Sequence, residues 1–490
     1  MTELYWGVSA GSHDAALSVV CGNEILFASS AERFSRIKND PDLNHELINY
    51  ALKFGKPSKI FYYEKSWLKK TRQLYAGQYH SLFKPSIASI LREFGVVSPV
   101  KEVSHHLSHA AGGYYTSKFD SAAVVVIDAI GEWETLSIWH AQGNKLKKLY
   151  SESYPNSLGL WYSAMTQRIG LRPNEEEYIL MGMSAFGDNK YYDFMLHDFF
   201  DISSKNLIKL NNNLHKGCKH WRVELIDTFN IAKSTQSLFE NYLIKIMNYA
   251  KSLTNEKNLV YMGGCALNCL ANSQLVNIFD NIWIMPNPGD SGSSIGAIAA
   301  GLSTHLTWRS PLLGYDISGK YPIEDAIEIL TKDGIVGVAA GKAEFGPRAL
   351  GNRSLLADPR SIDIKSAVNS IKKRQQFRPF APAILEEYAN DYFEMPMPAS
   401  PYMQYVSVCK TPSAFPAITH VDGTSRVQTV NKTDYPDFYK LLQAWYQATG
   451  CPMLLNTSLN IRGEPLVNTQ YDGECFSKKY NTPVLFSKNT

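Results

Sequence analysis

The sequence predicts an α/β protein in which one β-rich unit occurs twice and a further α/β unit follows. Three observations lead to this prediction. Residues 4–30 and 122–153 both alternate strand-type runs with short polar turns. Apolar residues recur at helical spacing in several segments between and after them. A stretch rich in Pro, Gly and Ser at 303–322 then precedes a renewed helix and strand pattern.

The two β-rich segments share one plan, which is strand, acid-bearing loop, strand, Gly-Asn turn and strand. The first is "LYWGVSA", "GSHD", "AALSVV", "CGNE", "ILFASS", and the second is "AAVVVID", "AIGEWE", "TLSIWHAQ", "GN", "KLKKLYSES". Turns of this kind between β-rich runs indicate hairpins. A duplication with an Asp in the first loop is expected of the two RNase H-like lobes of an actin-like (ASKHA) ATPase fold. Chance similarity of two hairpins is the alternative explanation.

Helical periodicity places three helices at residues 44–55, 86–95 and 235–253. A short buried strand, "LVYMGG", is expected at 259–264. A domain boundary is expected near residue 315, because the preceding stretch has no clear period. Beyond it, "IEDAIEILTKDG" predicts a helix and "IVGVAAG" a strand, where the second α/β domain starts.

Composition indicates a folded enzyme-like chain. The 490 residues are 44% apolar and 19% charged, which excludes a largely disordered protein. A net charge of +3 is too small over this length to identify a nucleic-acid binder by bulk electrostatics. Seven irregularly spaced cysteines predict no disulfide framework, and there is no signal-peptide pattern or bilayer-length apolar run. We therefore expect a cytoplasmic protein with no membrane partner.

Three histidines fall within five positions of "SHHLSHAA". In a helix, His105 and His109 lie one turn apart on one face, and His106 points about 100° away. Two imidazoles leave a metal ion under-coordinated, so carboxylates are needed, and the candidates are Asp128 at a strand end and Asp290 in a Gly-Ser segment. A mixed imidazole and carboxylate set suits Fe(II), Mn or Zn. Packed or solvated histidines are the alternative.

Two glycine-rich segments are candidates for nucleotide binding. "MGGCALNCLANSQL" (262–275) and "GDSGSSIGAIAAG" (289–301) each join a Gly turn to a small-residue helix start, where phosphate or adenine can approach the backbone. Neither matches a Walker loop or a dinucleotide fingerprint. Close helix packing is the alternative explanation. The six candidate nucleotide-binding residues are Gly131, Gly263, Gly264, Asn268, Gly289 and Ser291.

The second domain carries a basic segment at 344–378. Its cations are Arg348, Arg353, Arg360, Lys365, Lys372, Lys373, Arg374 and Arg378, against the acids Glu344, Asp358 and Asp363. Several of these arginines stand beside Gly, Pro or Phe, and arginine forks on stiff backbone suit a small doubly charged anion. Arg426 and Arg462 flank later polar turns and could complete such a pocket. Nucleic acid is the rival partner, but the charge is confined to short loops.

Together these motifs resemble the O-carbamoyltransferase family, which includes the nodulation and antibiotic-tailoring carbamoyltransferases. The resemblance covers nearly the whole chain in order, through "GSHDAAL", "AERFSRIKNDP", "HHLSHAAGGYY", "SLGLWYSAMTQRIGL", "MGGCALN", "GDSGSSIGAIAAG", "EFGPRALGNRSLLADPR", "FRPFAPAIL" and "LLNTSLNIRGEPLV".

The resemblance implies two domains and two half-reactions. Residues 1–315 would resemble the tRNA threonylcarbamoyl-transferring protein (Kae1-like), and residues 316–490 would form a YrdC-like α/β domain. The C-terminal domain would cleave carbamoyl phosphate and make carbamoyl-adenylate from ATP with loss of pyrophosphate. The N-terminal domain, which holds a divalent metal and the nucleotide, would pass the carbamoyl group to an acceptor hydroxyl. Fe(II) is the expected metal, with Mn, Zn or Mg as alternatives.

Carried over by resemblance, the metal ligands are His105, His109 and Asp290, with Asp128 near the metal and the nucleotide phosphates. His13 and Asp14 match the pair near the acceptor and would help to deprotonate its hydroxyl. The expected carbamoyl phosphate ligands are Lys38, Arg348, Lys372, Arg378, Arg426 and Arg462.

Some questions stay open at this stage. Sugar, nucleoside and hydroxymethylated base hydroxyls are all candidate acceptors, and nucleic acid enters only as a carrier of such a hydroxyl. Trp133, Trp161 and Tyr162 are candidates for a sugar or base platform, with core packing as the alternative. Ile179 and Gln375 depart from the family pattern. The rival functions are an actin-like kinase or ATPase and a tRNA threonylcarbamoyl-type subunit.

Overall fold

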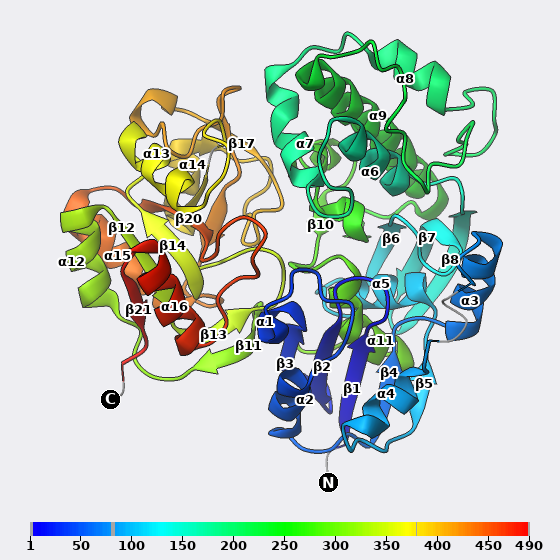
Figure 1. Ribbon diagram of the computed structural model, residues 1–490, viewed down its shortest axis with the longest axis horizontal. Coiled ribbons are helices and arrows are strands. Elements are labelled where there is room, and N and C mark those ends of the chain that lie inside the picture. The colour runs from blue at the N-terminus through cyan, green and yellow to red at the C-terminus, as the bar shows by residue number, and fades with distance from the viewer. Residues whose placement is uncertain (1–2, 80–83, 379, 489–490) are drawn as a thin grey trace. The chain divides into compact units, whose positions relative to one another are not determined.

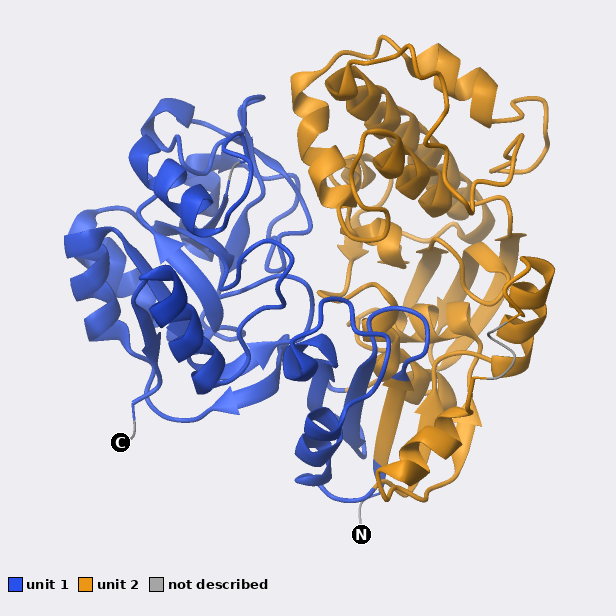
Figure 2. Ribbon diagram, viewed as in Figure 1, with its two compact units in different colours: residues 1–4, 9–56, 307–490 blue, residues 5–8, 57–306 orange. Residues whose placement is uncertain are grey.

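The computed structural model describes residues 3–79, 84–378 and 380–488 (Figure 1). The chain divides into two compact units (Figure 2). One comprises residues 1–4, 9–56 and 307–490, and the other comprises residues 5–8 and 57–306. Both contain helices and sheets, so the α/β prediction is confirmed. The assignment of domains to 1–315 and 316–490 stays a prediction.

Two five-stranded sheets have the same strand order, β3-β2-β1-β4-β5 in one and β8-β7-β6-β9-β10 in the other. The pairs β2–β3 and β7–β8 are antiparallel, whereas β1–β4, β4–β5, β6–β9 and β9–β10 are parallel. This repeated order confirms the actin-like prediction. The strands are β1 (Leu4–Ser9), β2 (Ala16–Cys21), β3 (Glu24–Ser30), β4 (Lys59–Tyr62), β5 (Val100–Glu102), β6 (Ser121–Ile127), β7 (Glu134–Gln142), β8 (Lys145–Ser153), β9 (Asn258–Met262) and β10 (Asn281–Trp283).

Helices join and follow the strands of the unit of residues 57–306. They are α3 (Ser66–Tyr75), α4 (Ile87–Glu93), α5 (His105–Tyr114), α6 (Leu158–Arg168), α7 (Glu177–Met183), α8 (Tyr192–Phe199), α9 (Thr228–Thr254), α10 (Cys269–Asn272) and α11 (Ser293–Leu302), with short 3-10 turns η2 (Ser184–Phe186), η3 (Gly264–Leu267), η4 (Leu275–Asn277) and η5 (Asp290–Gly292). Helices α5 and α11 pack closely, because Gly112 and Gly296 have no side chains to separate them. A Cβ at Gly112 would lie 3.2 Å from the Cα of Gly296.

In the other unit, residues 307–490 form a mixed sheet ordered β19-β15-β20-β14-β12-β21, the pair β11-β13 and the sheet β16-β17-β18. The strands are β11 (Leu312–Ile317), β12 (Ile335–Ala339), β13 (Gly341–Glu344), β14 (Arg353–Ala357), β15 (Ala381–Leu385), β16 (Phe393–Glu394), β17 (Ser407–Cys409), β18 (Thr424–Ser425), β19 (Gln428–Val430), β20 (Met453–Ser458) and β21 (Val484–Phe486). The helices of this unit are α1 (Glu32–Ser35), α2 (His45–Leu52), α12 (Ile323–Asp333), α13 (Ile362–Ile371), α14 (Ala389–Tyr392), α15 (Pro436–Thr449) and α16 (Gln470–Tyr480), with η6 (Glu386–Tyr388) and η7 (Pro412–Ala414).

The core of residues 307–490 is formed by apolar side chains of the mixed sheet and the helices against it, among them Leu355, Leu455 and Val368 of α13. The helix and strand expected after the linker are α12 and β12, so the renewed α/β pattern is confirmed. The YrdC-like assignment stays a prediction.

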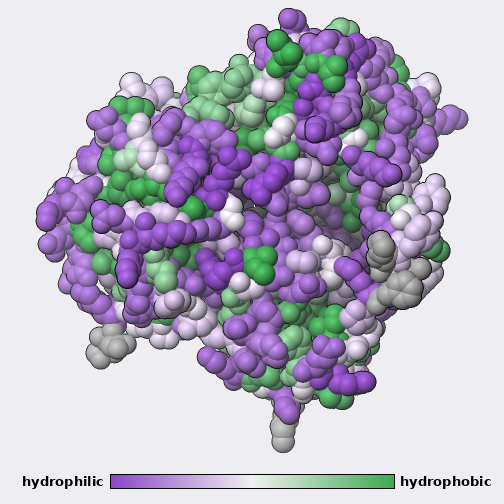
Figure 3. Space-filling view, in the orientation of Figure 1, coloured by the Kyte–Doolittle hydropathy of each residue, from purple (hydrophilic) through white to green (hydrophobic). Residues whose placement is uncertain are grey.

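The helices expected at 44–55, 86–95 and 235–253 correspond to α2, α4 and α9. Helix α9 extends over 27 residues, and its N-cap Asp227 accepts hydrogen bonds from the amides of Phe229 and Asn230. On the face shown in Figure 3, hydrophobic residues form separate small groups within a mostly hydrophilic surface. Among the described residues, no helix has the length and apolar character needed to cross a bilayer.

Candidate metal centre and active site

The candidate metal centre lies in the unit of residues 57–306, where strand ends and two helix starts meet. Helix α5 begins at His105, and the close packing of α5 on α11 brings Asp290, just before α11, toward this helix. Strand β6 ends at Ile127, and Asp128 follows it directly. Because β6 and β9 are parallel, the loop after β9 reaches the same sheet edge, where the Gly264 amide donates to Asp128 Oδ1 at 3.3 Å.

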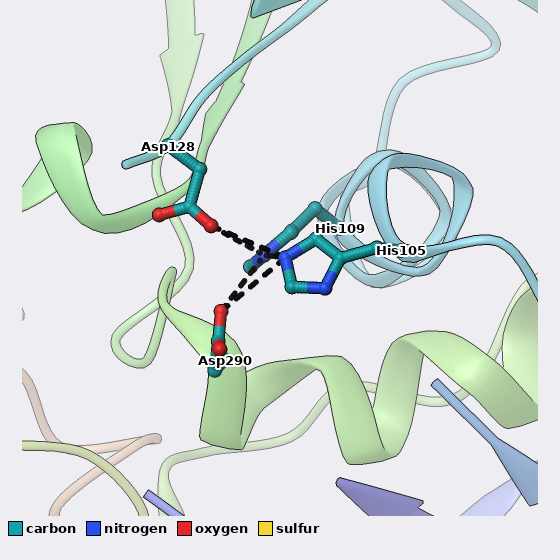
Figure 4. A group of neighbouring side chains, drawn as sticks. All are labelled: His105, His109, Asp128 and Asp290. Carbon is teal, nitrogen blue, oxygen red and sulfur yellow. Dashed lines mark hydrogen bonds and ion pairs between the residues drawn. The ribbon is translucent and has the colours of Figure 1, made fainter. Parts of the chain in front are cut away.

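His105, His109, Asp128 and Asp290 converge there (Figure 4). Their candidate ligand atoms all lie within 4.8 Å of one another. The two imidazole Nε2 atoms are 3.1 Å apart, and Asp290 Oδ1 lies 3.4 Å from His105 Nε2 and 3.3 Å from His109 Nε2. Asp128 Oδ2 lies 3.1 Å from His105 Nε2 and 3.8 Å from His109 Nε2. The four side chains therefore surround one point.

His106 points away from this cluster, as a helical segment requires. Its Nδ1 lies 2.7 Å from Ser137 Oγ, and the residue is fully buried. Burial, followed by the nearby charges of His105 and His109, holds the pKa of His106 well below its usual range. His106 is therefore a neutral packed side chain, which was the alternative for all three histidines.

In this buried cluster, the charge of each imidazole or carboxylate depends on the charges of the others. Burial opposes ionisation of Asp290, but the charge of His105 and hydrogen bonds from His105 and His109 outweigh it and hold the pKa of Asp290 well below its usual range. Burial likewise opposes protonation of His105, and the carboxylates of Asp290 and Asp128 raise its pKa well above the usual value. The carboxylates are thus anionic, as cation ligands must be.

The chemistry of this donor set fits a divalent transition metal. Ser293 Oγ lies 3.1 Å from Nδ1 of His109, so Nε2 of the same ring faces the carboxylates. A second ring nitrogen held by a hydrogen bond is typical of metal-ligating histidines. Two imidazoles and two carboxylates suit Fe(II), Mn or Zn and do not select among them.

The candidate nucleotide-binding residues lie in the same unit, and several serve packing. Gly131 lies against the imidazoles, since a Cβ there would be 3.0 Å from Cδ2 of His105. Gly263 has φ +93°, where a side chain would also meet the carbonyl of Ile127. A Cβ at Gly289 would meet nothing within 4 Å, so this backbone is open to close approach.

The two polar residues of that set are engaged within the protein. Asn268 and Gln236 of α9 form a reciprocal amide pair at 3.0 and 2.9 Å, and Asn268 also caps α10 through the amide of Ala271. Ser291 Oγ donates to Oδ1 of Asn287 at 3.0 Å. Their role in nucleotide binding stays a prediction.

His13 and Asp14 lie in the other unit, on the loop between β1 and β2. His13 Nδ1 and Asp14 Oδ2 are 3.1 Å apart, and both side chains are about one-third exposed (40% and 32%). Asp14 has a left-handed backbone (φ +51°). An exposed imidazole oriented by a carboxylate can accept a proton from a bound hydroxyl.

The predicted anion ligands of this unit differ in what they already contact. Lys38 Nζ pairs with Glu32 at 2.8 Å. Lys372 is buried, and its ammonium donates to four oxygens, two of Ser458 at the end of β20 and two of Asn460 just beyond it. Burial and the charges of Arg374 and Arg378 hold the pKa of Lys372 well below its usual range.

The remaining four, Arg348, Arg378, Arg426 and Arg462, are not fully buried. The structure brings Arg378 close enough to lower the pKa of Lys372, and the amide of Arg462 donates to the Lys372 carbonyl at 3.2 Å. Nε of Arg426 is buried and has no hydrogen-bond partner among the described residues. The charge of Arg378 and the backbone of Arg462 therefore both lie close to Lys372.

One arginine of the basic segment is structural. Arg353 is fully buried, and its guanidinium donates to the carbonyls of Tyr315, Ala340, Gly341, Asn352 and Asn468. Burial lowers its pKa to about 10 despite the nearby Glu344 carboxylate. Glu344 in turn accepts from three backbone amides of the loop that carries Arg348.

Sequence reasoning missed several supporting residues. Glu132 accepts a hydrogen bond from the amide of His105, and Ser293 contacts His109. Arg33 donates to the carbonyl of Gly346, and Arg36 donates to the carbonyls of Pro465 and Leu466. Glu132 stands one position from the predicted site residue Gly131, and Ser293 stands two positions from Ser291, which was an available signal. The partners of Arg33 and Arg36 lie more than 300 positions away, so no local pattern could identify them.

Family models of the carbamoyltransferase N-terminus and C-terminus match residues 65–299 and 327–489. The nodulation protein NolNO of Sinorhizobium fredii is 30% identical, over 94% of this chain and 76% of that protein. The chain belongs to the carbamoyltransferase family. This confirms the resemblance found in the sequence and the prediction of a carbamoyltransferase enzyme.

Two further similarities accompany this assignment. The 3'-hydroxymethylcephem-O-carbamoyltransferase of Amycolatopsis lactamdurans is 27% identical to this carbamoyltransferase and covers 94% of both chains. The solved structure of full-length HypF in the phosphate- and nucleotide-bound form aligns with a TM-score of 0.41 and 14% identity, over 61% of this chain and 55% of that chain.

Proposed function

We propose that this carbamoyltransferase converts carbamoyl phosphate and ATP into carbamoyl-adenylate and then transfers the carbamoyl group to a hydroxyl of an acceptor. The observation that carries the proposal is the convergence of two imidazoles and two carboxylates in a chain of this family. A buried anionic pair beside two imidazoles is costly unless a cation or its equivalent neutralises it.

In the first half-reaction, residues of the C-terminal part would hold the anion. Carbamoyl phosphate and water give carbamate and phosphate, and carbamate then attacks the α-phosphorus of ATP, which releases pyrophosphate. Arg348, Arg378 and Arg462 supply guanidinium groups for the anion, and Lys372 holds the loop that bears Arg462. Lys38 and Arg426 are proposed as further ligands. Shielding from water keeps the labile carbamate available for adenylation.

In the second half-reaction, the acceptor oxygen attacks the carbamoyl carbon, the bond to the adenylate oxygen breaks, and AMP leaves. His13, oriented by Asp14, would accept the hydroxyl proton. The amides at Gly264 and Gly289 and the side chain of Asp128 would position the nucleotide. A divalent metal bound by His105, His109 and Asp290 would supply charge stabilisation to the nucleotide phosphate.

Product analysis tests this proposal. The protein is incubated with ATP, labelled carbamoyl phosphate and a panel of hydroxylated sugars and nucleosides. AMP and pyrophosphate that form only with carbamoyl phosphate support it, and so does label in an acceptor. ADP formation would instead indicate an actin-like kinase or ATPase. Retention of tRNA with no dependence on carbamoyl phosphate would indicate a threonylcarbamoyl-type subunit.

A further inference from the structure

The segment between α8 and α9, residues 201–227, is a long irregular loop of the unit of residues 57–306 (Figure 1). An isolated β-bridge joins Leu210 in this loop to Phe200, just after α8. Loops longer than about 15 residues are uncommon in compact domains and usually have a function when they are ordered. The proposed function assigns this loop no role.

The underside of the loop is fixed to the rest of its unit. Arg168 of α6 donates hydrogen bonds to the carbonyls of Trp221 and Leu225. The amide of Leu207, which is buried, donates to Oε1 of Glu152 in β8 at 3.0 Å. The loop therefore has a defined shape that needs little further ordering when a partner binds.

The outward side of the loop is basic. Residues 205–222 include five Lys or Arg residues and no Asp or Glu. The acids on either side are engaged, since Asp198 pairs with Arg222 at 2.6 Å and Asp227 caps α9. The loop thus offers positive charge to a partner. Its exposed lysines are Lys205, Lys209, Lys216 and Lys219.

A hollow of about 170 Å³ lies where the start of this loop meets α8 and α9. Lys245 of α9 borders it, and its Nζ donates to the carbonyl of Leu207 at 3.2 Å and lies 5.6 Å from the centre of the Tyr242 ring. Asp201 is the acid among the lining residues, and its Oδ1 accepts from the hydroxyl of Ser203 at 2.6 Å. We call Ile202, Asn206, Lys209, Tyr242 and Lys245 the basic hollow.

The size and charge of the basic hollow suit one small anionic group. Two ammonium groups, those of Lys209 and Lys245, face one carboxylate, that of Asp201, so the balance is positive. Pockets for drug-sized ligands measure about 300–1,000 Å³, which is larger than this hollow. A phosphate whose substituent stays outside fits these limits.

Ile202 shows which kind of phosphate fits best. This side chain borders the hollow and is 62% exposed. Nucleic acid strands are held by charge and by stacking on aromatic rings, so an aliphatic neighbour adds little to their binding. An anionic lipid joins a phosphate to acyl chains, so lysines can contact its headgroup while an isoleucine enters the acyl boundary.

From this arrangement we infer that the basic hollow docks the protein on an anionic membrane by binding the phosphate of a lipid headgroup. Lys209 and Lys245 hold the phosphate, the amide of Asn206 donates to it, and Ile202 inserts beside the acyl chains. Attachment of this kind needs no membrane-spanning helix, and it would replace the expectation of no membrane partner. The inference does not depend on the proposed function.

Flotation of the full chain with lipid vesicles tests the inference. We expect binding to vesicles of equal parts phosphatidylcholine and phosphatidylglycerol and none to phosphatidylcholine alone. Lys209→Glu and Lys245→Glu should each weaken binding at least about tenfold, because reversal turns an attraction into a repulsion, while Lys209→Arg retains it. Ile202→Ser should weaken binding at unchanged charge, because the apolar contact is lost.

The matched control is Lys118→Glu, which makes the same change of charge at an exposed lysine of the same unit and should bind normally. Circular dichroism and the thermal midpoint of each variant check its folding. Absence of flotation in a folded protein that still forms pyrophosphate with carbamoyl phosphate would overturn this inference and leave the proposed function standing.

Four further outcomes would also overturn the inference. Equal losses for Lys209→Glu and Lys118→Glu would show attraction by overall charge. Unchanged binding by Ile202→Ser would remove the contact that distinguishes a lipid from other phosphates. Calorimetric binding of sn-glycerol 3-phosphate without vesicle binding would indicate a site for a soluble phosphate ester. Binding of a DNA duplex that depends on Lys209, again without vesicle binding, would indicate a nucleic-acid surface.

Discussion

The His/Asp cluster and the basic segment use charged side chains in opposite ways. In the cluster, four side chains from separate elements converge so that their ligand atoms lie within 4.8 Å of one another. In the basic segment, each cation has its own surroundings, from the fully buried Arg353 to the exposed Arg360. The comparison teaches that side chains from separate elements meeting at one point identify a candidate site. A segment with many cations does not, because some of those cations can bind a ligand while others hold the fold together.

The largest expected effect concerns the cluster. His109→Ala or Asp290→Ala removes one donor, so we expect bound Fe(II) or Mn to be lost and carbamoyl transfer to fall at least a hundredfold. Pyrophosphate release that depends on carbamoyl phosphate should survive. Metal analysis and the two product assays measure these effects. Asp280→Ala, at an exposed carboxylate, is the control. Equal loss of both half-reactions would contradict the division between the two regions.

Arg353 provides the corresponding test of a structural cation. Arg353→Leu leaves three buried and two partly buried carbonyls without their donor, so we expect the free energy of unfolding to fall by about 3–5 kcal/mol. Urea denaturation measures it. Arg360→Leu breaks only a partly exposed pair with Asp358 and should cost less than about 1 kcal/mol. Similar values for both variants would show that burial does not distinguish these cations.

Arg348 tests a cation expected to act on the substrate. Its loop is held by Glu344, so Arg348→Ala should leave the fold intact while removing a guanidinium from the anion pocket. We expect a loss of about 10²–10³-fold in pyrophosphate release, and transfer should fall with it because it depends on that product. Product assays and a thermal melt measure the two properties. Transfer that persists without pyrophosphate release would refute this order of steps.

Arg36 tests whether a distant turn positions the basic loop. Its guanidinium donates to the carbonyls of Pro465 and Leu466, just beyond Arg462, and its Nε lies 3.6 Å from Asp472. Arg36→Gln should raise the KM for carbamoyl phosphate about tenfold and change kcat less, since a shifted loop weakens binding of the anion. Arg36→Lys should not restore it, because one ammonium cannot replace the planar fork. Arg309→Gln, at an exposed pair, is the control.

Much of the fold could be predicted from sequence, because its signals are local. The hairpin turns and alternating runs identified both copies of the repeated unit, and helical periodicity identified α2, α4 and α9. The grouping of residues 9–56 with 307–490 had no such signal. It reflects contacts between segments about 300 positions apart, such as Arg33 with Gly346.

The candidate site shows the same limit. His105 and His109 were predictable as neighbours because helical geometry fixes their spacing, and Asp128 because it follows a strand. The engagement of Asn268 with Gln236 was not predictable, since nothing in the glycine-rich segment indicates α9 as its partner. Of the three aromatic residues considered for a platform, Trp161 and Tyr162 are buried in α6, and Trp133 is the partly exposed one. Because α6 is largely apolar on all sides, its sequence did not show which of its aromatic side chains would be buried.

The smallest expected effect lies in the turn before Arg426, where His420 Nδ1 is 3.5 Å from Asp422 Oδ1. Burial opposes ionisation of Asp422, but hydrogen bonds from His420 and Thr424 outweigh it and lower its pKa to about 2. A carboxyl with a lowered pKa stabilises the fold above its unfolded value and loses that contribution as the pH falls toward 2. Asp422→Asn should therefore cost about 1 kcal/mol at pH 6, discounted for partial exposure, and almost nothing near pH 2. Urea denaturation of both proteins across this range measures the difference. A constant difference would show that the pair, unlike the His/Asp cluster, holds its turn by shape and not by charge.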